Sequence, residues 1–183
     1  MKNVLIIHPK DKSTDFLCHI YKNIPNKTVV TGSVTKDEII ELINLHSQVI
    51  MLGHGSPSGL FSVGQFYGQG MFIIDKTAVN ALKTKNNNIF IWCNANQFVN
   101  THSLKGLYSG MFISEVSEAN YCEINTDQTQ INESNNEFSY MLGSQLLIGN
   151  KLNIIYDNVS MLYGKLAKHN PVAAYNHARW YMC

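Results

Sequence analysis

The chain of 183 residues is 45% hydrophobic and 15% charged, which is enough apolar material for one globular domain with a sizeable core. A formal net charge of +1, with Lys and Arg scattered along the chain, gives no reason to expect nucleic acid or a membrane surface as a partner. No apolar run reaches the length of a membrane span, and the N-terminal run is too short for a signal peptide. We therefore expect a cytoplasmic protein.

Short apolar runs separated by helical patterns predict strands joined by helices. The expected strands are residues 3–7, 27–32, 48–53, 88–93 and 110–114. Apolar residues at helical spacing predict a helix over residues 14–24, between the first two strands. Thr35 with Glu38 three residues later is the capping-box pattern, and it predicts that a helix starts there and runs to residue 46.

The segment 59–74 alternates glycines with apolar residues and predicts a β-hairpin or an irregular flap. Its aromatic side chains would either contact a substrate or cover a sheet edge; they are Phe61, Phe66, Tyr67 and Phe72. A helix is expected next, with Asp75 as its N-cap. Beyond residue 115, the polar stretch 125–137 predicts a loop. Helices are expected over residues 137–148, 156–169 and 171–181.

Strands that alternate with helices predict an α/β fold, with a mainly parallel central sheet and helices on both sides. We expect a single domain over residues 1–183, with its core over about 1–148 and C-terminal helices over about 150–183. In such a sheet, reactive groups gather at the carboxyl ends of the strands, where the loops converge.

Two predicted strands end in residues suited to catalysis. One ends in His54 followed by Gly55, and the next core strand ends in Cys93, 39 residues after His54. That separation fits one hairpin and one crossover helix, so the two side chains are expected on neighbouring strand ends. Attack by cysteine on a carbonyl needs a thiolate, a proton shuttle and donors for the oxyanion. Cys93 would supply the first, His54 the second, and the backbone amides of Gly55 and Cys93 the third.

Residues around this pair are the expected substrate contacts. Ser56 lies in the loop after Gly55, and Trp92 and Asn94 flank the cysteine. Glu115 and Glu118 follow the fifth predicted strand and would line a substrate pocket, although a role as solvated loop acids is the competing interpretation.

The sequence gives no sign of a metal or another cofactor. The remaining histidines show no ligand spacing; they are His8, His19, His46, His102, His169 and His177. The four cysteines lie far apart without a CxxC pair, so neither a zinc site nor a disulfide framework is expected.

A strand that ends in "LGHG", a spacer with a hairpin and a helix, and a strand that ends in "IFIWC" together resemble the caspase-like cysteine peptidases. That superfamily includes the metacaspase, clostripain, gingipain and legumain branches. The resemblance covers roughly residues 1–148 and implies the three-layer α/β/α sandwich of that group, with His54 and Cys93 as the catalytic dyad. The chain departs from the pattern at "WCNAN", where many members carry a small residue before the cysteine and a glycine after it. It also has Ile91 where branches that cleave after basic residues often carry an acid.

Three classes of function remain open at this point. The first is a thiol protease, a hydrolase that cleaves a peptide or protein substrate. The second is an inactive caspase-like module that binds a partner through the same groove. The third is a flavodoxin-like protein that binds a small ligand with "GHGSPSG" as an anion-binding loop, although this loop lacks the Lys and the glycine spacing of a P-loop. The sequence gives no oligomeric state.

Overall fold

The computed structural model describes residues 3–67 and 70–183, which form two compact units. Unit 1 comprises Met1–Asp11, Asn26–Gly110 and Tyr181–Cys183. Unit 2 comprises Lys12–Pro25 and Met111–Trp180. Each unit is built from separate stretches of the chain. The single caspase-like domain expected from the sequence stays a prediction.

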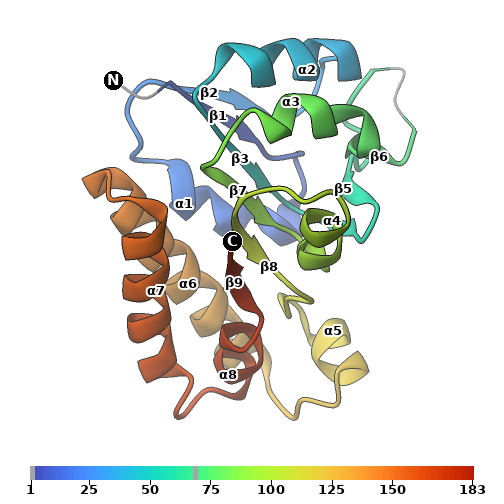
Figure 1. Ribbon diagram of the computed structural model, residues 1–183. Coiled ribbons are helices and arrows are strands. Elements are labelled where there is room, and N and C mark those ends of the chain that lie inside the picture. The colour runs from blue at the N-terminus through green and yellow to red at the C-terminus, as the bar shows by residue number, and fades with distance from the viewer. Residues whose placement is uncertain (1–2, 68–69) are drawn as a thin grey trace. The chain divides into compact units, whose positions relative to one another are not determined.

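A six-stranded, mostly parallel sheet forms the centre of unit 1 (Figure 1). In spatial order its strands are β2 (Lys27–Val30), β1 (Val4–Ile7), β3 (Gln48–Leu52), β7 (Asn88–Ile91), β8 (Gly106–Ser109) and β9 (Trp180–Met182). The first five pair in parallel. The last is antiparallel to β8, since Gly106 and Cys183 exchange both backbone hydrogen bonds, at 3.0 and 3.1 Å. The prediction of an α/β fold with a mainly parallel sheet is confirmed.

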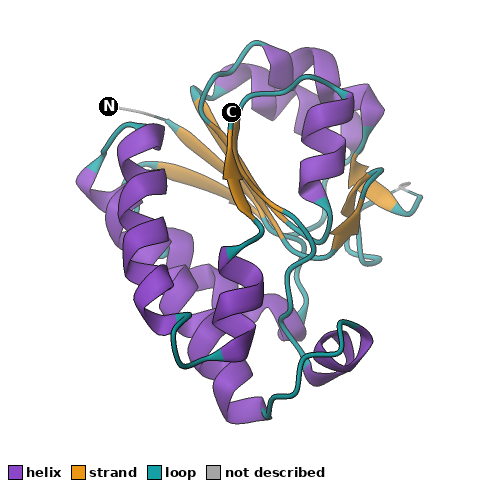
Figure 2. Ribbon diagram, turned by 60° about the horizontal axis from the view of Figure 1, so that its bottom comes forward, coloured by secondary structure: helices purple, strands orange, loops and turns teal. Residues whose placement is uncertain are grey.

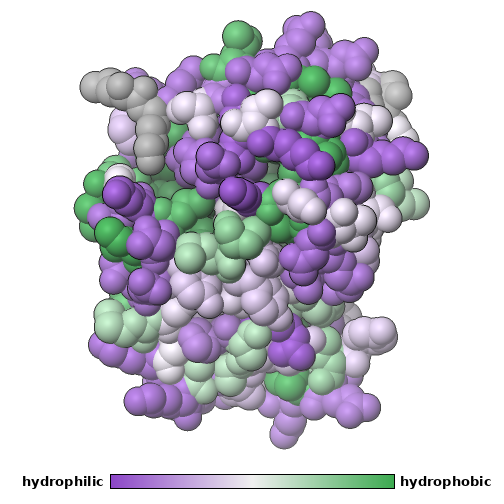
Figure 3. All heavy atoms as spheres, viewed as in Figure 1, coloured by the Kyte–Doolittle hydropathy of each residue, from purple (hydrophilic) through white to green (hydrophobic). Residues whose placement is uncertain are grey.

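Three helices of unit 1 pack on one face of this sheet (Figure 2). They are α2 (Lys36–Leu45), α3 (Val79–Lys83) and α4 (Ala95–Thr101). Alternate strand residues such as Leu5, Met51 and Phe90 meet Ile39 of α2 and Phe98 of α4 in one apolar core. The surface over α2 is mostly hydrophilic (Figure 3), as expected for a helix that buries one side only.

The predicted starts of two helices are confirmed. Thr35 and Glu38 form the capping box of α2, in which each side chain accepts a hydrogen bond from the backbone amide of the other residue. Asp75 accepts from the backbone amide of Thr77 at 2.8 Å and caps the 3-10 turn η2 (Lys76–Ala78), which leads into α3. These caps satisfy amides that have no partner within the helix.

A second, three-stranded antiparallel sheet follows β3 and confirms the predicted hairpin. Its strands are β4 (Gly55–Ser56), β5 (Gly59–Phe61) and β6 (Phe72–Ile74), in that order. Phe61 and Phe72 pack ring against ring, with centroids 5.2 Å apart. Gly68 and Gln69, which belong to the predicted flap, lie outside the described residues.

Unit 2 is helical in the residues described. It contains the 3-10 helix η1 (Lys12–Leu17), α1 (Cys18–Tyr21), α5 (Val116–Tyr121), α6 (Gln128–Ile148), α7 (Leu152–Leu166) and α8 (Pro171–His177). Phe138 of α6 packs against Tyr163 of α7 and against Trp180, each with ring centroids 5.3 Å apart. At Gly143, α6 approaches α1 so closely that a Cβ atom would lie 2.4 Å from the carbonyl oxygen of His19.

The predicted strand over residues 110–114 is wrong, because the fifth strand of the sheet is β8, at residues 106–109. Ile113 is fully buried although it is not in a strand. Its amide donates to Asn176 Oδ1 at 2.8 Å, and its carbonyl accepts from Asn176 Nδ2 at 2.9 Å. One carboxamide thus supplies both bonds that a neighbouring strand would otherwise have made.

The predicted loop over residues 125–137 is also wrong. Asp127 accepts from the amide of Gln130 at 2.9 Å and caps α6, which starts at Gln128. Ile131, Ser134 and Phe138 form the buried stripe of this first part of the helix. Packing of that stripe outweighs the low helix propensity of an Asn-rich sequence.

The helix predicted over residues 171–181 ends early. The helix α8 ends at His177, and Trp180–Met182 form β9 instead. The strand forms because its partner β8 supplies an open edge, which no local pattern near residue 180 reveals.

Candidate functional site

The pairing of β3 with β7 sets the backbone positions of the two candidate catalytic residues. Leu52 is opposite Ile91 in the parallel ladder, and the Gly53 amide donates to the Ile91 carbonyl at 3.0 Å. His54 and Cys93 each lie two residues beyond this last pair. Both residues therefore follow the carboxyl ends of neighbouring strands, which lie about 4.8 Å apart. The expected placement on adjacent strand ends is confirmed.

Each strand end turns sharply, and backbone conformation explains how. Gly53 adopts φ +135°, a conformation that residues with a Cβ rarely take, and this turns the chain from β3 towards β4. After β7, the Ala95 amide donates to the Trp92 carbonyl at 3.2 Å, with Asn94 in the left-handed region at φ 65°. Cys93 thus lies at the corner of a tight strand-to-helix turn, and it is half-buried.

Asp11 is a third group at this edge, and our sequence analysis missed it. Its Oδ2 lies 3.9 Å from His54 Nε2, and each side chain is about one-third or less exposed. Asp11 follows β1, which pairs with β3 although β2 and α2 separate the two strands in the chain. In a sheet of this order, ligands bind outside the carboxyl ends, where the order of strands reverses. Here that point lies between β1 and β3, the strands that precede Asp11 and His54.

Trp92 joins the small sheet to the large one. Its side chain is only 1% exposed, and its Nε1 donates to the Ser56 carbonyl at 3.1 Å. A Cβ atom on Gly55 would lie 2.3 Å from Trp92 Cδ1, so only glycine fits against the indole. This burial corrects the prediction that Trp92 contacts substrate: the side chain positions the segment that follows His54. The same burial of Trp92 explains why a large residue comes immediately before Cys93.

Ser109 is a second residue that sequence reasoning missed. Its buried hydroxyl, at the end of β8, accepts from the Trp92 amide at 3.1 Å and donates to the Trp92 carbonyl at 2.9 Å. The Asn94 amide donates to the Gly110 carbonyl at 3.0 Å. Residues on both sides of Cys93 are therefore fixed to the end of β8. The sequence offered no signal for this role, because Ser109 comes before the strand predicted over residues 110–114.

The antiparallel pairing of β4 with β5 orients the Gly55 amide. The Phe61 amide donates to the His54 carbonyl at 2.9 Å, and Gly55 is opposite Leu60, one position further along. Residues in an antiparallel ladder alternate between positions that exchange hydrogen bonds and positions that do not. The Gly55 amide accordingly points away from β5, as an oxyanion donor would require. The oxyanion role of the Cys93 amide stays a prediction.

The other predicted substrate contacts have the following positions. Ser56 is half-buried, and its Oγ accepts from the Ser58 amide at 3.2 Å, within the β4–β5 turn. Asn94 is half-buried beside Cys93. Glu115 and Glu118 belong to unit 2; Glu118 accepts from the Ser114 amide at 2.7 Å, while Glu115 is exposed and lines a cavity of that unit. Their roles as substrate contacts stay predictions.

Within residues 3–67 and 70–183, no group of three His, Cys, Asp or Glu side chains is arranged to hold a metal ion. None of the four cysteines forms a disulfide within the part of the chain that the structure describes. None of the described helices combines the length and the apolar character that a membrane crossing needs.

No protein-family model, curated protein or solved structure matches the chain.

The position of Trp92 leads to a prediction about stability. Trp92→Phe keeps an aromatic ring in the core but loses the hydrogen bond to Ser56, so we expect about 2 kcal/mol less unfolding free energy. Chemical denaturation measures this. Trp180→Phe is a matched control, because Trp180 is also buried but its Nε1 has no hydrogen-bond partner among the described residues. Equal losses in the two variants would show that the Trp92–Ser56 bond contributes nothing.

Proposed function

We propose that this chain is a cysteine peptidase of the caspase-like type, with His54 and Cys93 as its catalytic dyad. The observation that carries the proposal is the β3–β7 register, which brings both residues to neighbouring strand ends. The three-layer α/β/α arrangement and membership in the caspase-like superfamily are parts of the same proposal. Its substrate is a peptide or protein.

In the proposed reaction, His54 accepts the thiol proton of Cys93, and the thiolate attacks the scissile carbonyl carbon. The carbonyl oxygen becomes an oxyanion, which the amides of Gly55 and Cys93 stabilise. His54 then protonates the leaving amine, and the C–N bond breaks to give a thioester. Water, deprotonated by His54, hydrolyses the thioester and returns the thiol.

Asp11 has a positioning role in this scheme. A carboxylate beside an imidazole can hold the ring in one orientation. The 3.9 Å separation from His54 Nε2 is longer than a hydrogen bond, and such contacts often tighten only when substrate is bound.

The alternative of a flavodoxin-like anion loop has less support. In "GHGSPSG", Ser56 is paired with Gly59 across the hairpin, and the Ser58 amide bonds the Ser56 side chain. An anion-binding loop needs several amides that converge on one point, whereas here Ser56 belongs to the hairpin, the Ser58 amide is bonded to a side chain and Pro57 has no N–H. No observation favours the inactive binding module. It is one of the possible outcomes of the alkylation test described next.

The test measures how fast iodoacetamide alkylates each cysteine, followed by peptide mass spectrometry. We expect Cys93 to react faster than Cys122 and Cys183, and His54→Ala to slow Cys93 about tenfold at neutral pH, because an unassisted thiol is only a few per cent thiolate. His102→Ala, which changes a histidine outside the proposed site, serves as the control. If Cys93 reacts like an ordinary thiol in the wild type and in His54→Ala, the two residues form no dyad and the binding module gains support.

A further inference from the structure

The three-stranded sheet after β3 has an outer face that carries a row of side chains next to His54. Leu60 of β5 is fully buried in the core, so Phe61, the next residue, points to the opposite face. The Phe61 amide donates to the His54 carbonyl at 2.9 Å, which extends the β4–β5 pairing by one position. Residues opposite each other in such a pair lie on the same face, with Cβ atoms about 5 Å apart. The proposed base therefore has an aromatic side chain as its cross-strand neighbour.

This row continues into β6. Phe72 is paired with Phe61, and the two rings contact each other with centroids 5.2 Å apart. Both residues are half-buried, whereas Phe66 of the same segment is 7% exposed and belongs to the core. The two roles expected for these aromatic side chains thus fall to different residues. Phe66 packs in the interior, while Phe61 and Phe72 form an aromatic surface that is open to solvent.

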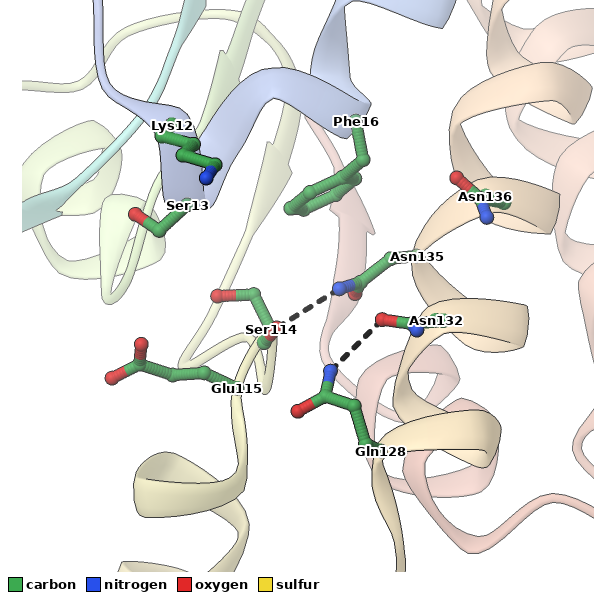
Figure 4. A pocket seen from close by; sticks show the side chains of 9 residues that line it. All are labelled: Lys12, Ser13, Phe16, Ser114, Glu115, Gln128, Asn132, Asn135 and Asn136. Atoms are coloured by element: carbon green, nitrogen blue, oxygen red, sulfur yellow. Dashed lines mark hydrogen bonds between the residues drawn. The ribbon is translucent and has the colours of Figure 1, made fainter.

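A hollow of about 540 Å³ adjoins this aromatic surface. Phe61, Val63 and Met71 provide its apolar walls, and Met71 is 68% exposed. None of the described residues that line it is charged. The cavity of unit 2 is different, because its walls include Lys12, Glu115 and the side-chain amides of α6 (Figure 4). The hollow beside Phe61 is therefore suited to an apolar group and has the volume of a small-ligand site.

The hollow lies on the side of His54 that faces away from Cys93. In the large sheet, β7 and β2 are on opposite sides of β3, and Cys93 follows β7. The segment between β5 and β6 reaches the β2 side, because the Ser33 amide, after β2, donates to the Gln65 carbonyl at 2.8 Å. A hydrogen bond of 2.8 Å from the Ser62 amide to the Met71 carbonyl joins the two arms of this segment. The hollow is thus formed before any ligand binds, so little order has to be imposed when a side chain enters.

We propose that this hollow binds a large apolar side chain, that of the substrate residue directly after the scissile bond. The inference rests on the proposed peptidase function, in which Cys93 bonds the acyl part and His54 protonates the amine of the residue that leaves. That residue accordingly lies beside His54, on the side away from Cys93. The rings of Phe61 and Phe72 stack with an aromatic side chain or cover an aliphatic one, and the flexible Met71 adapts to either. A charged side chain would lose its hydration there without gaining a partner.

The test uses the full chain and peptides that differ only in the residue after the cleaved bond. Digestion of a peptide library, analysed by mass spectrometry, first identifies a cleaved sequence, and that one residue is then replaced by phenylalanine, leucine, glycine or aspartate. The kcat/KM for phenylalanine or leucine should exceed that for glycine at least about tenfold, the selectivity that one apolar pocket provides. Phe61→Ala should lower this ratio about fivefold and Met71→Ala about threefold, with the glycine peptide nearly unaffected.

Leu45→Ala is the matched control, because Leu45 is an apolar residue of α2 that is 74% exposed and does not line the hollow. Its selectivity ratio should equal that of the wild type. Thermal unfolding is recorded for every variant. If Phe61→Ala unfolds, Met71→Ala still decides the question, because Met71 is mostly exposed.

The outcomes separate this inference from the peptidase proposal. Cleavage without a preference for an apolar residue after the scissile bond overturns the inference and leaves the peptidase in place. A preference that neither Phe61→Ala nor Met71→Ala reduces has the same meaning. If no peptide in the library is cleaved, the peptidase proposal fails and this inference fails with it.

Discussion

Replacing Cys93 with alanine is expected to reduce cleavage of a proteome-derived peptide library by at least about 10³-fold, to the level of the buffer control. The reason is chemical: alanine cannot form the thioester, and no other described thiol lies at the end of a strand next to His54. Cys93→Ser is expected to be nearly as inactive, because a hydroxyl loses its proton far less readily than a thiol. Product peptides are counted by mass spectrometry.

Cys183→Ala is the matched control for this experiment. Cys183 is exposed, and its Sγ donates to the Leu104 carbonyl at 3.1 Å. Its loss should leave the cleavage rate unchanged. Equal activity of Cys93→Ala and the wild type would remove Cys93 from the reaction, whatever its position.

Gly55→Ala is expected to lower kcat about 10²-fold. The added methyl group would overlap Trp92 Cδ1 at 2.3 Å and the Gly59 carbonyl oxygen at 2.6 Å. Because Trp92 is fully packed in the core, β4 must move instead, and the proposed oxyanion donor moves with it. A displacement of about 1 Å in a catalytic group is enough for a loss of this size.

Gly70→Ala separates this effect from a general sensitivity of the flap to alanine. Gly70 precedes β6, and among the described residues other than its chain neighbours no atom lies within 4 Å of the position that its Cβ would take. That variant should retain wild-type kcat. Circular dichroism and thermal unfolding of both variants show how much folded protein each assay contains. A Gly55→Ala protein that loses activity only in proportion to its unfolded fraction would contradict the oxyanion role.

Local sequence patterns were sufficient to predict the elements whose structure depends on residues nearby in the chain. The capping box at Thr35 and the N-cap at Asp75 were predicted because their partners lie two or three residues away. The strands β3 and β7 were predicted because both are buried along their whole length and read as continuous apolar runs. His54 and Cys93 follow those same two strands, so the position of the candidate site also came from local signals.

Elements that depend on distant partners were not predictable in this way. Ile113 looked like part of a strand because it is apolar and buried, yet its hydrogen-bond partner is the side chain of Asn176, 63 residues away. The strand β9 exists because Cys183 pairs with Gly106. No pattern within either segment contains that information.

The candidate site residues show the same difference between features that depend on nearby residues and features that depend on distant partners. Asp11 was missed because its closeness to His54 depends on β1 being next to β3, a property of sheet order and not of sequence order. Ser109 was missed because its importance depends on the β7–β8 register. Trp92 was noticed but given the wrong role, since residue type alone does not distinguish a buried positioning ring from an exposed contact.

The proposed reaction is attack by Cys93 on a peptide carbonyl with the help of His54. Its most direct test is covalent capture with a mixture of peptidyl acyloxymethyl ketones, which react with a cysteine only after binding as a substrate does. Intact mass and peptide mapping should show one adduct, on Cys93, that forms at least about 10²-fold more slowly in His54→Ala. Adducts spread over Cys18, Cys122 and Cys183, or labelling of Cys93 at the same rate in His54→Ala, would show that His54 and Cys93 do not act as a dyad.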